Sequence, residues 1–414
     1  MAVWQAALDA GDPVPLVRRA LRTADIGDRR RVLVLGCGKA GGAMARGAED
    51  VLGDRIADGF VVVKDGYTKP TRTIRLAEAR HPVPDARGEA ASAALLALAA
   101  RAGKDDLVLF LVSGGGSALT PAPAAPVTLA EKQTVTRLLL EAGATIGELN
   151  AVRKHLSRFK GGQLARAAAP ARVVTLALSD VIGDPLDVIA SGPTAPDPTT
   201  FTDALAVIDR RGVADRVPAS VRDRLASGAR GEIDETPKPG DAIFERITNV
   251  IIGNNSIVTD AAVAAATHLG LAPQLLTRSL EGEARVVARE LVDRARALPP
   301  RACLIAGGET TVTVKGSGRG GRCQEFALAA AIAIDGHDDL VVLAAGTDGT
   351  DGPTDAAGAV VDGSTVARGR AHGADAARSL DDNDSHAFLR AAGDLIVTGP
   401  TNTNLLDLYV LVRR

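Results

Sequence analysis

Aromatic residues are scarce in this sequence: 414 residues include seven Phe, two Tyr and one Trp. Proteins that bind single-stranded nucleic acid stack the bases on aromatic side chains, so this scarcity argues against that class. The formal net charge is −2 at pH 7. A duplex-binding surface needs a net basic face, so the charge argues against that class too. We therefore expect no nucleic-acid partner, although a local basic pocket for a small anion is compatible with both observations.

Cysteine and long apolar runs are scarce as well. Cys37, Cys303 and Cys323 are the three cysteines, too few for a disulfide framework and without the C-x-x-C spacing of a zinc site. The N-terminal segment lacks the basic-then-apolar pattern of an export signal, and no apolar run reaches the roughly 18 residues of a membrane span. These absences predict a cytoplasmic protein that does not enter a membrane.

The first half of the chain alternates short apolar runs with helical patterns. Strands are expected at 31–36, 59–64, 106–112 and 171–179, and helices at 40–52 and 88–102. Continuous apolar strands separated by helices predict a parallel sheet with helices on both faces. In such sheets, ligands bind beyond the carboxyl ends of the strands. The loops after residues 35, 112 and 179 are therefore the first places to look for a site.

The chain is too long for one ordinary core, so two domains are expected. The segment 231–244 is acidic, contains prolines and shows no periodicity, which makes it the candidate boundary. We place the domains at 1–238 and 239–414. The second half is predicted to be α/β as well, with helices at 259–270, 283–298 and 324–334, a strand at 339–349, and two strands followed by a glycine-rich loop within 303–322.

The strand-to-helix turn at 36–42 has the spacing G-x-G-x-x-G, with Lys39 inside it. Backbone N–H groups at the start of a helix and a cation in the turn both stabilise bound phosphate. A nicotinamide dinucleotide would also need an acidic residue after the next strand, for which Asp65 is available. A tight structural turn with Lys39 in water is the remaining alternative.

A second glycine loop, SGGGSAL at 113–119, follows another expected strand and offers a nest for a phosphate. The basic segment 150–165 then carries Arg153, Lys154, Arg158 and Lys160 at helical spacings. We expect most of these cations to form a solvated helix face. Arg153, His155 or Lys160 could instead reach into a pocket.

Carboxylates gather in other loops that follow strands. Asp180 stands where the strand 171–179 ends, and Asp184 and Asp187 follow it. Such oxygens suit Mg²⁺, but aspartates are equally common in turns, and both readings stay open. In the second half, three further loops carry polar side chains, namely Glu309, Arg319 and Arg322, then Asp348, Asp351 and Asp355, and finally Asn402 and Asn404.

Eight motifs, taken in order, resemble those of the class II glycerate kinases, the glycerate 2-kinase family also called MOFRL or hydroxypyruvate reductase-like. They are GCGKA, SGGGSAL, RKHLSRFKGGQLA, LSDVIGDPLDVIASGPT, GGETTVTV, GRGGRCQEFAL, AAGTDGTDGPTDAAG and TGPTNTN. The resemblance extends from about residue 30 to the end of the chain. One departure is Cys323, which stands where the motif G-R-x-Q-E leads us to expect a polar residue such as asparagine.

The resemblance implies two α/β domains with an interdomain cleft, the N-terminal domain being a Rossmann-like parallel sheet covered by helices on both faces. It also implies the phosphorylation of D-glycerate at its 2-hydroxyl by ATP with Mg²⁺, which gives 2-phosphoglycerate and ADP. Small molecules are then the expected partners, and the chain is expected to be a monomer or a homodimer.

Two functional residues follow from matching motifs: Lys39 from G-x-G-K-A and Arg322 from G-R-x-Q-E. With Asp180 they form the predicted catalytic set, and Asp180 and Asp351 are the predicted metal ligands. The same positions suggest a set of substrate- and phosphate-binding residues: Gly36, Gly38, Ser113, Gly114, Gly115, Gly116, Ser117, Arg153, Lys160, Glu309 and Asn402.

Two other functions remain to be weighed. A hydroxypyruvate reductase using NAD(P)H would need a general acid, normally a histidine backed by a carboxylate, and none of the six histidines lies in a recognisable pair of that kind. A non-catalytic nucleotide-binding protein would bind ATP without turnover, which the presence of Lys39 and Arg322 argues against.

Overall fold

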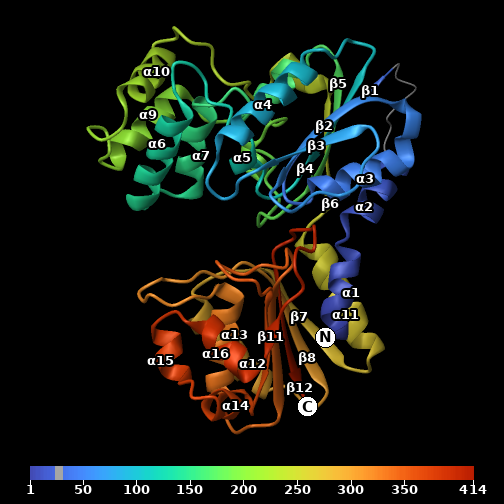
Figure 1. Cartoon of the computed structure of the whole chain (residues 1–414), viewed down its shortest axis with the longest axis vertical. Coiled ribbons are helices and arrows are strands. Elements are labelled where there is room, and N and C mark those ends of the chain that lie inside the picture. Colours follow the sequence, from blue (N-terminus) through green and yellow to red (C-terminus); the bar gives the residue numbers. More distant parts are fainter. Residues whose placement is uncertain (24–30) are drawn as a thin grey trace. The chain divides into compact units, whose positions relative to one another are not determined.

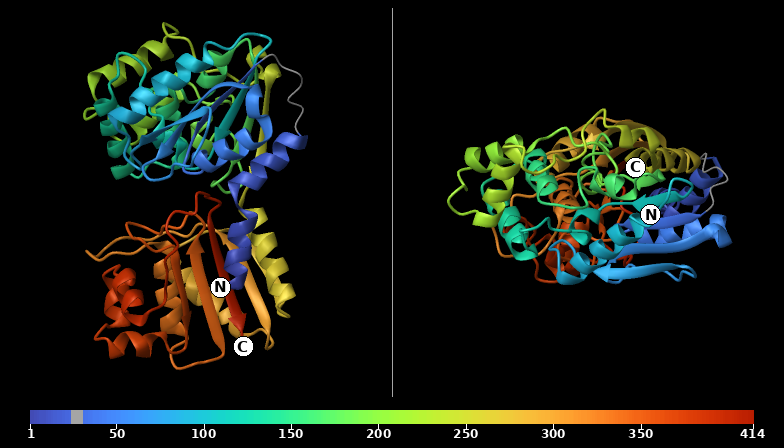
Figure 2. Two further views of the ribbon diagram at one scale, coloured as in Figure 1. Left: turned by 45° about the vertical axis from the view of Figure 1, so that its right-hand side comes forward. Right: turned by 90° about the horizontal axis from the view of Figure 1, so that it is seen from above.

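The computed structural model describes residues 1–23 and 31–414, which form two compact units. One comprises Pro13–Ile252, here called the 13–252 unit. The other comprises Gly253–Arg414 together with Met1–Asp12, here called the 253–414 unit. Figures 1 and 2 show that each unit has its own sheet and its own helices.

The 13–252 unit contains a six-stranded sheet in the order β3-β2-β1-β4-β5-β6. Its strands are β1 (Val32–Cys37), β2 (Ile56–Lys64), β3 (Ile74–Ala79), β4 (Leu107–Val112), β5 (Arg172–Leu178) and β6 (Ile247–Gly253). β1 pairs in parallel with both β2 and β4, so the strand order reverses direction between β1 and β4. All residues of β1 and β4 are buried, as their unbroken apolar sequences predict. The Rossmann-like parallel arrangement predicted for the first half is confirmed.

Helices cover this sheet and add a separate lobe. Those beside the sheet are α2 (Pro13–Thr23), α3 (Gly41–Leu52), α4 (Ala86–Ala99), α5 (Gly116–Leu119) and α8 (Gln163–Ala168). A further group, here called the helical lobe, consists of α6 (Leu129–Glu141), α7 (Ile146–His155), α9 (Phe201–Arg210) and α10 (Ala219–Ala229). The lobe has its own apolar core around Leu139, Val152 and Phe201. Figure 2 shows these green helices gathered at one end of the unit.

The 253–414 unit is built on a mixed sheet in the order β11-β10-β9-β12-β8-β7. The strands are β7 (Ala272–Leu280), β8 (Ala302–Gly308), β9 (Leu340–Gly346), β10 (Gly358–Asp362), β11 (Leu395–Ile396) and β12 (Asp407–Arg413). β12 runs antiparallel to both of its neighbours. The helices are α1 (Ala2–Ala10), α11 (Asn255–His268), α12 (Ala284–Arg296), α13 (Arg322–Ala333), α14 (Thr365–Ala371), α15 (Ala376–Asp381) and α16 (Ser385–Ala392).

One expectation for this second sheet is wrong: the segment 303–322 contains one strand, not two. After β8, the chain forms only an isolated bridge between Thr311 and Glu283. The N–H groups of Lys315 and Gly316 donate to the side chain of Asn383 instead of pairing in a strand. The segment TTVTV is extended without being part of the sheet: the N–H groups of Thr311 and Thr313 donate to the carbonyl of Gly282 and to the side chain of Glu283.

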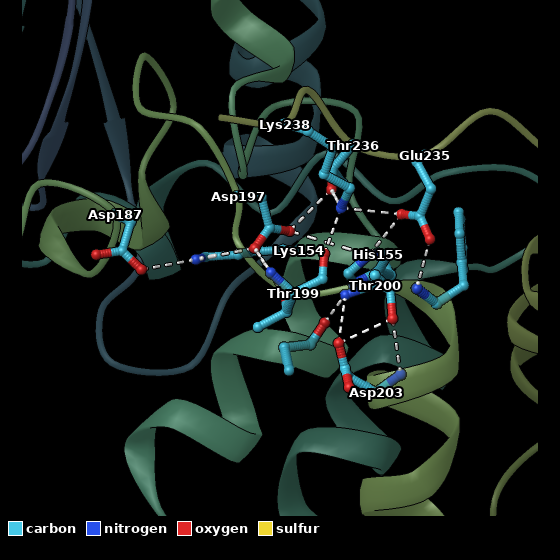
Figure 3. A network of polar contacts seen from close by, with 12 residues as sticks. Lys154, His155, Asp187, Asp197, Thr199, Thr200, Asp203, Glu235, Thr236 and Lys238 are labelled. Atoms are coloured by element: carbon cyan, nitrogen blue, oxygen red, sulfur yellow. Dashed lines mark hydrogen bonds and ion pairs between the residues drawn. The ribbon is translucent and has the colours of Figure 1, made fainter. Parts of the chain in front are cut away.

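The division into units also differs from the predicted domains, 1–238 and 239–414. The first twelve residues pack with the 253–414 unit, where α1 lies against α11 and Trp4 is buried. At the other end, the acidic segment 231–244 belongs to the 13–252 unit. Figure 3 shows why: Glu235, Thr236 and Lys238 join a network of polar contacts within that unit. The segment 231–244 shows no hydrophobic periodicity because polar contacts hold it in the 13–252 unit, and it is not a linker between domains.

Candidate active site

The two glycine loops predicted to bind phosphate lie against each other in the 13–252 unit. The N–H of Lys39 donates to the carbonyl of Gly114 at 2.9 Å, and the N–H of Ala40 donates to Ser113 Oγ at 3.0 Å. A Cβ at Gly38 would lie 2.1 Å from Ser113 Oγ, so only glycine permits this approach. The loops meet because β1 and β4 are neighbours, and the point where strand order reverses is the usual ligand site of such sheets.

Lys39 and a histidine that the sequence did not single out flank the second glycine loop. A Cβ at Gly115 would lie 3.1 Å from His81 Cδ2 and 3.3 Å from Lys39 Cγ. Gly115 has φ +83°, a conformation that glycine adopts without strain. Since His81 sits in RHPVPD, with no periodic or glycine pattern around it, no sequence signal pointed to it. The structure thus adds an imidazole to the predicted loop pair.

Backbone strain occurs beside the same loop, in the segment ASG at 190–192. Ala190 has φ +50° and Ser191 φ +62°, values that are costly for residues other than glycine. Ser191 Oγ lies 2.9 Å from Ser117 Oγ and donates to Asn150 Oδ1 at 3.1 Å. Non-glycine residues held in this conformation cluster at functional sites, which supports a site at Ser117 and Ser191.

The basic segment 150–165 differs from the solvated helix face that we expected. α7 ends at His155, and Lys154 and Lys160 are both buried. The Lys160 ammonium donates to the carbonyls of Ser117, at 2.6 Å, and Thr120, at 3.2 Å. Burial lowers the pKa of Lys160 well below its usual value, and the nearby Arg153 lowers it further. Lys160 therefore contacts the second glycine loop directly.

Lys154 lies between two aspartates, as Figure 3 shows. Its ammonium is 3.2 Å from Asp187 and 3.3 Å from the fully buried Asp197. Asp187 belongs to the loop after β5 that also carries Asp180. This pairing satisfies the Asp187 carboxylate with an ammonium, so Asp187 anchors the loop.

Two histidines do pair with carboxylates, contrary to the sequence expectation: His386 Nε2 lies 3.3 Å from Asp355, and His155 is the buried case. His155 Nε2 lies 3.1 Å from Glu235 and 3.9 Å from Asp197, while Nδ1 contacts the carbonyl of Ala151 at 2.7 Å. The ring is buried and its edge packs against Phe201. Because both ring nitrogens have protein partners, this pair is not positioned to protonate a substrate.

Asp180 follows β5 by two residues and is partly exposed. β5 pairs in parallel with β4, so Asp180 stands at the same carboxyl edge of the sheet as the two glycine loops. Among residues 1–23 and 31–414, no group of three or more His, Cys, Asp or Glu side chains is arranged to hold a metal ion. A Mg²⁺ ion bound with a nucleotide needs only one or two carboxylates, and Asp180 fits that requirement.

A second polar cluster lies in the 253–414 unit, around Arg322 at the start of α13. The guanidinium donates twice to Asp407, from Nε at 2.6 Å and from Nη2 at 3.0 Å, and its Nη1 pairs with Glu309. Burial lowers the pKa of Arg322, but the Asp407 carboxylate outweighs it, so the pKa is raised and the cation is secure. The buried carboxylate of Asp407 thus fixes the orientation of the Arg322 guanidinium.

Asp351, predicted as a metal ligand, instead caps α13. Its carboxylate accepts the N–H of Cys323 at 3.1 Å, and the N–H and side-chain amide of Gln324 at 2.8 and 3.0 Å. A Cβ at Gly321 would lie 2.2 Å from Asp351 Oδ1, which explains a glycine in this loop. The structure therefore favours a structural role for Asp351. Cys323 contributes its backbone N–H here, and its thiol is buried.

The titration of Asp351 makes a testable contribution to stability. Burial raises its pKa from the usual 3.8 to about 6, although the N–H groups of Gln324 and Cys323 oppose this. Because the pKa is raised, the folded state binds the proton of Asp351 more tightly than the unfolded state does. The stability that this proton contributes is therefore complete below pH 4 and is lost as pH rises through 6. Asp351→Asn does not titrate. We expect the free energy of unfolding of this variant, relative to wild type, to increase by about 2 kcal/mol from pH 4 to pH 7. Denaturant unfolding at both pH values measures this, and a constant difference would contradict it.

The last predicted loop, TGPTNTN, packs against the loop after β9. Thr401 Oγ1 donates to the carbonyl of Thr347 at 2.6 Å, and a Cβ at Gly349 would lie 2.1 Å from the carbonyl of Gly399. Asn402 has φ +62°, and its amide donates to the carbonyl of Pro400 at 3.2 Å. The loop is thus in place at the end of the sheet where β12 begins, but no contact ties Asn402 to Arg322 within the described residues.

Two glycine loops that meet beside a lysine, on a parallel sheet, are the candidate site of an α/β protein, and their composition suits an anion. Residues 1–226 match the family described as "Domain of unknown function (DUF4147)", and residues 302–407 match the MOFRL family. A "D-glycerate 2-kinase" of Thermotoga maritima is 45% identical over 391 residues, 92% of this chain and 90% of that one. A "Putative hydroxypyruvate reductase" of Agrobacterium vitis is 42% identical, over 99% and 93% of the two chains.

The crystal structure of a Thermotoga maritima glycerate kinase has the same fold. It superimposes with a TM-score of 0.89 at 42% identity and covers 100% of this chain and 98% of that one. The chain belongs to the glycerate kinase family, and in it a DUF4147 match is followed by a MOFRL match. Over the described residues, no helix is both long and apolar enough to cross a membrane.

Proposed function

We propose that this enzyme transfers the γ-phosphoryl group of ATP to the 2-hydroxyl of D-glycerate, giving 2-phosphoglycerate and ADP. The observation that carries the proposal is Lys39, set between two glycine loops where the strand order reverses. Relatives named glycerate 2-kinase or glycerate kinase support the choice of substrate. Phosphoryl transfer asks the protein mainly to position the reactants and to neutralise charge, and these groups do both.

In this proposal, Lys39 and the backbone amides of Gly114–Gly116 neutralise the transferring phosphoryl group. Charge stabilisation of this kind lowers the barrier most when the groups are fixed before the reaction. The hydrogen bonds of Lys39 and Ala40 to the second loop provide that fixation. Arg322 orients the glycerate carboxylate or stabilises the γ-phosphoryl group, since a guanidinium held from behind presents its remaining N–H groups in a fixed direction.

Asp180 would accept the proton of the 2-hydroxyl or hold Mg²⁺ with phosphate oxygens. When bound, the ion would neutralise charge on the phosphates. Asp351 is not proposed for either role, because its carboxylate caps α13.

Incubation of the protein with D-glycerate, ATP and Mg²⁺ tests the proposal. We expect a product that enolase alone consumes, since enolase acts on the 2-phosphate and leaves the 3-phosphate untouched. A product that enolase consumes only after a mutase is added would reject the 2-hydroxyl as the acceptor. No ADP formation would reject the kinase.

A hydroxypyruvate reductase is the second candidate, favoured by the name of the Agrobacterium vitis relative. Two observations weigh against it. Asp65, the residue available for a ribose, forms an ion pair with Arg87 at 2.7 Å, and His155 has both ring nitrogens occupied. NAD(P)H oxidation with hydroxypyruvate, measured beside ADP formation from glycerate, separates the two functions.

A further inference from the structure

A cavity of about 720 Å³ opens between the helical lobe and the second glycine loop of the 13–252 unit. Helices α6 and α7 form one wall, the segment 82–84 and Pro121 form another, and Ser117 and Lys160 lie on the side of the glycine loop. Nothing in the proposed roles of Lys39, Asp180 and Arg322 uses this space.

Four cationic side chains line the cavity, Lys132, Arg137, Arg153 and Lys160, and of these Arg137 pairs with Glu141. Over the part of the chain that the structure describes, the Arg153 guanidinium makes no hydrogen bond or ion pair. Burial alone lowers the pKa of Arg153 to about 10. Arg153 is half-buried, and an anion placed beside its guanidinium would give it the partner that the described residues do not supply.

Among residues 1–23 and 31–414, neither Lys132 nor Lys160 is paired with a carboxylate. Lys132 donates to the carbonyls of Pro121, at 2.6 Å, and Leu156, at 3.1 Å, as Lys160 does to those of Ser117 and Thr120. The one acidic residue on the lining is Glu141, which pairs with Arg137 and Arg216. Arg153 thus adds to the lining a positive charge that no carboxylate among the described residues pairs with.

The size and the apolar part of the lining decide which anion fits. A three-carbon acid would leave most of the space empty, whereas cavities of 300–1,000 Å³ suit ligands of nucleotide size. Val83, Leu129, Leu140 and Leu149 provide apolar surface for a base and a sugar, and Gln133 and Thr134 provide polar groups. At the other end, Ser117 and Pro82 adjoin Gly115–Gly116 and His81, where Lys39 lies.

We propose that this cavity binds the nucleoside triphosphate, with Arg153 contacting a phosphate and the walls of α6 and α7 holding the nucleoside. The inference rests on the proposed kinase function and names where its phosphate donor binds. The terminal phosphate then points along Ser117 toward Lys39, and glycerate binds outside the cavity.

Titration calorimetry with the β,γ-imido analogue of ATP and Mg²⁺ tests this without turnover. Arg153→Met removes the phosphate contact, and Ala130→Trp places an indole at an exposed lining position of α6. Each change is expected to raise the Kd of the analogue at least about tenfold. Matched controls are Arg19→Met and Ala94→Trp, exposed positions of α2 and α4 away from the cavity, which should leave the Kd unchanged.

The KM values for ATP and glycerate identify the ligand further. We expect the KM for ATP to rise in both cavity variants while the KM for glycerate changes less than about twofold. A raised KM for glycerate with unchanged analogue binding would assign the cavity to glycerate and overturn the inference, as would unchanged Kd values in both variants. Since Ala130 is exposed, Ala130→Trp keeps the test valid if Arg153→Met does not fold. If the cavity variants bind the analogue normally but the wild-type enzyme makes 2-phosphoglycerate, the inference about the cavity is wrong and the proposed kinase function is still supported.

Discussion

Replacing Lys39 with alanine is expected to lower kcat about a hundredfold or more. A single preorganised charge at the site of phosphoryl transfer contributes roughly 3 kcal/mol or more to lowering the barrier. The fold should survive, because backbone hydrogen bonds between the two glycine loops stay in place. Steady-state kinetics with glycerate and ATP measure the loss, and thermal unfolding measures the fold.

Lys104→Ala is the matched control for Lys39→Ala. Lys104 is exposed just before β4, at the amino end of a strand whose carboxyl end leads into the second glycine loop. We expect its kcat to equal that of wild type. Near-normal turnover in Lys39→Ala would remove this lysine from the mechanism.

Replacing Arg322 with methionine should reduce both activity and stability. Asp407 is 1% exposed and receives two hydrogen bonds from Arg322, so the variant leaves a buried carboxylate without its cation. We expect the free energy of unfolding to fall by about 3 kcal/mol and kcat to fall about a hundredfold or more. Denaturant unfolding and steady-state kinetics give the two numbers.

The double variant Arg322→Met with Asp407→Asn separates these effects. A neutral amide removes the unpaired charge, so most of the lost stability should return while kcat stays low. If kcat returned together with stability, Arg322 would have only a structural role. If neither returned, the Tyr409 hydroxyl, which donates to Asp407 at 3.1 Å, would be the contact that matters.

The sequence predicted the first sheet well because its strands are buried on both faces. VLVLGC and LVLFLV have no polar residue that would blur the pattern, and both became six-residue buried strands. The pattern was weaker where an element is partly exposed. β3, IRLAEA, and β7, APQLLTRSL, both include exposed residues. No strand was predicted at either position, since charged residues interrupt their apolar runs.

For the candidate site, local patterns identified loops but not what each side chain contacts. The glycine spacing around Lys39 was sufficient to predict the turn itself, because this turn forms between one strand and the helix that directly follows it. Asp351 could not be assigned from its own loop, since its partners at Cys323 and Gln324 are distant in sequence. The same holds for Lys154 and Asp197, and for Arg322 and Asp407, whose pairing depends on the tertiary fold.

The packing of α1 on α11 has a practical consequence for dividing the protein into parts. A fragment that starts at Gly253 would lack α1, so the surface of α11 that packs against α1 and Trp4 would be exposed to solvent. Deleting the first twelve residues from the full chain would expose the same surface of the 253–414 unit. Met1 and Arg414 lie near each other in all three views of Figures 1 and 2. A gene that encodes 253–414, a short glycine-rich spacer and then 1–12 would therefore yield this unit, which contains the MOFRL match, as a self-contained protein for crystallisation or NMR apart from the 13–252 unit.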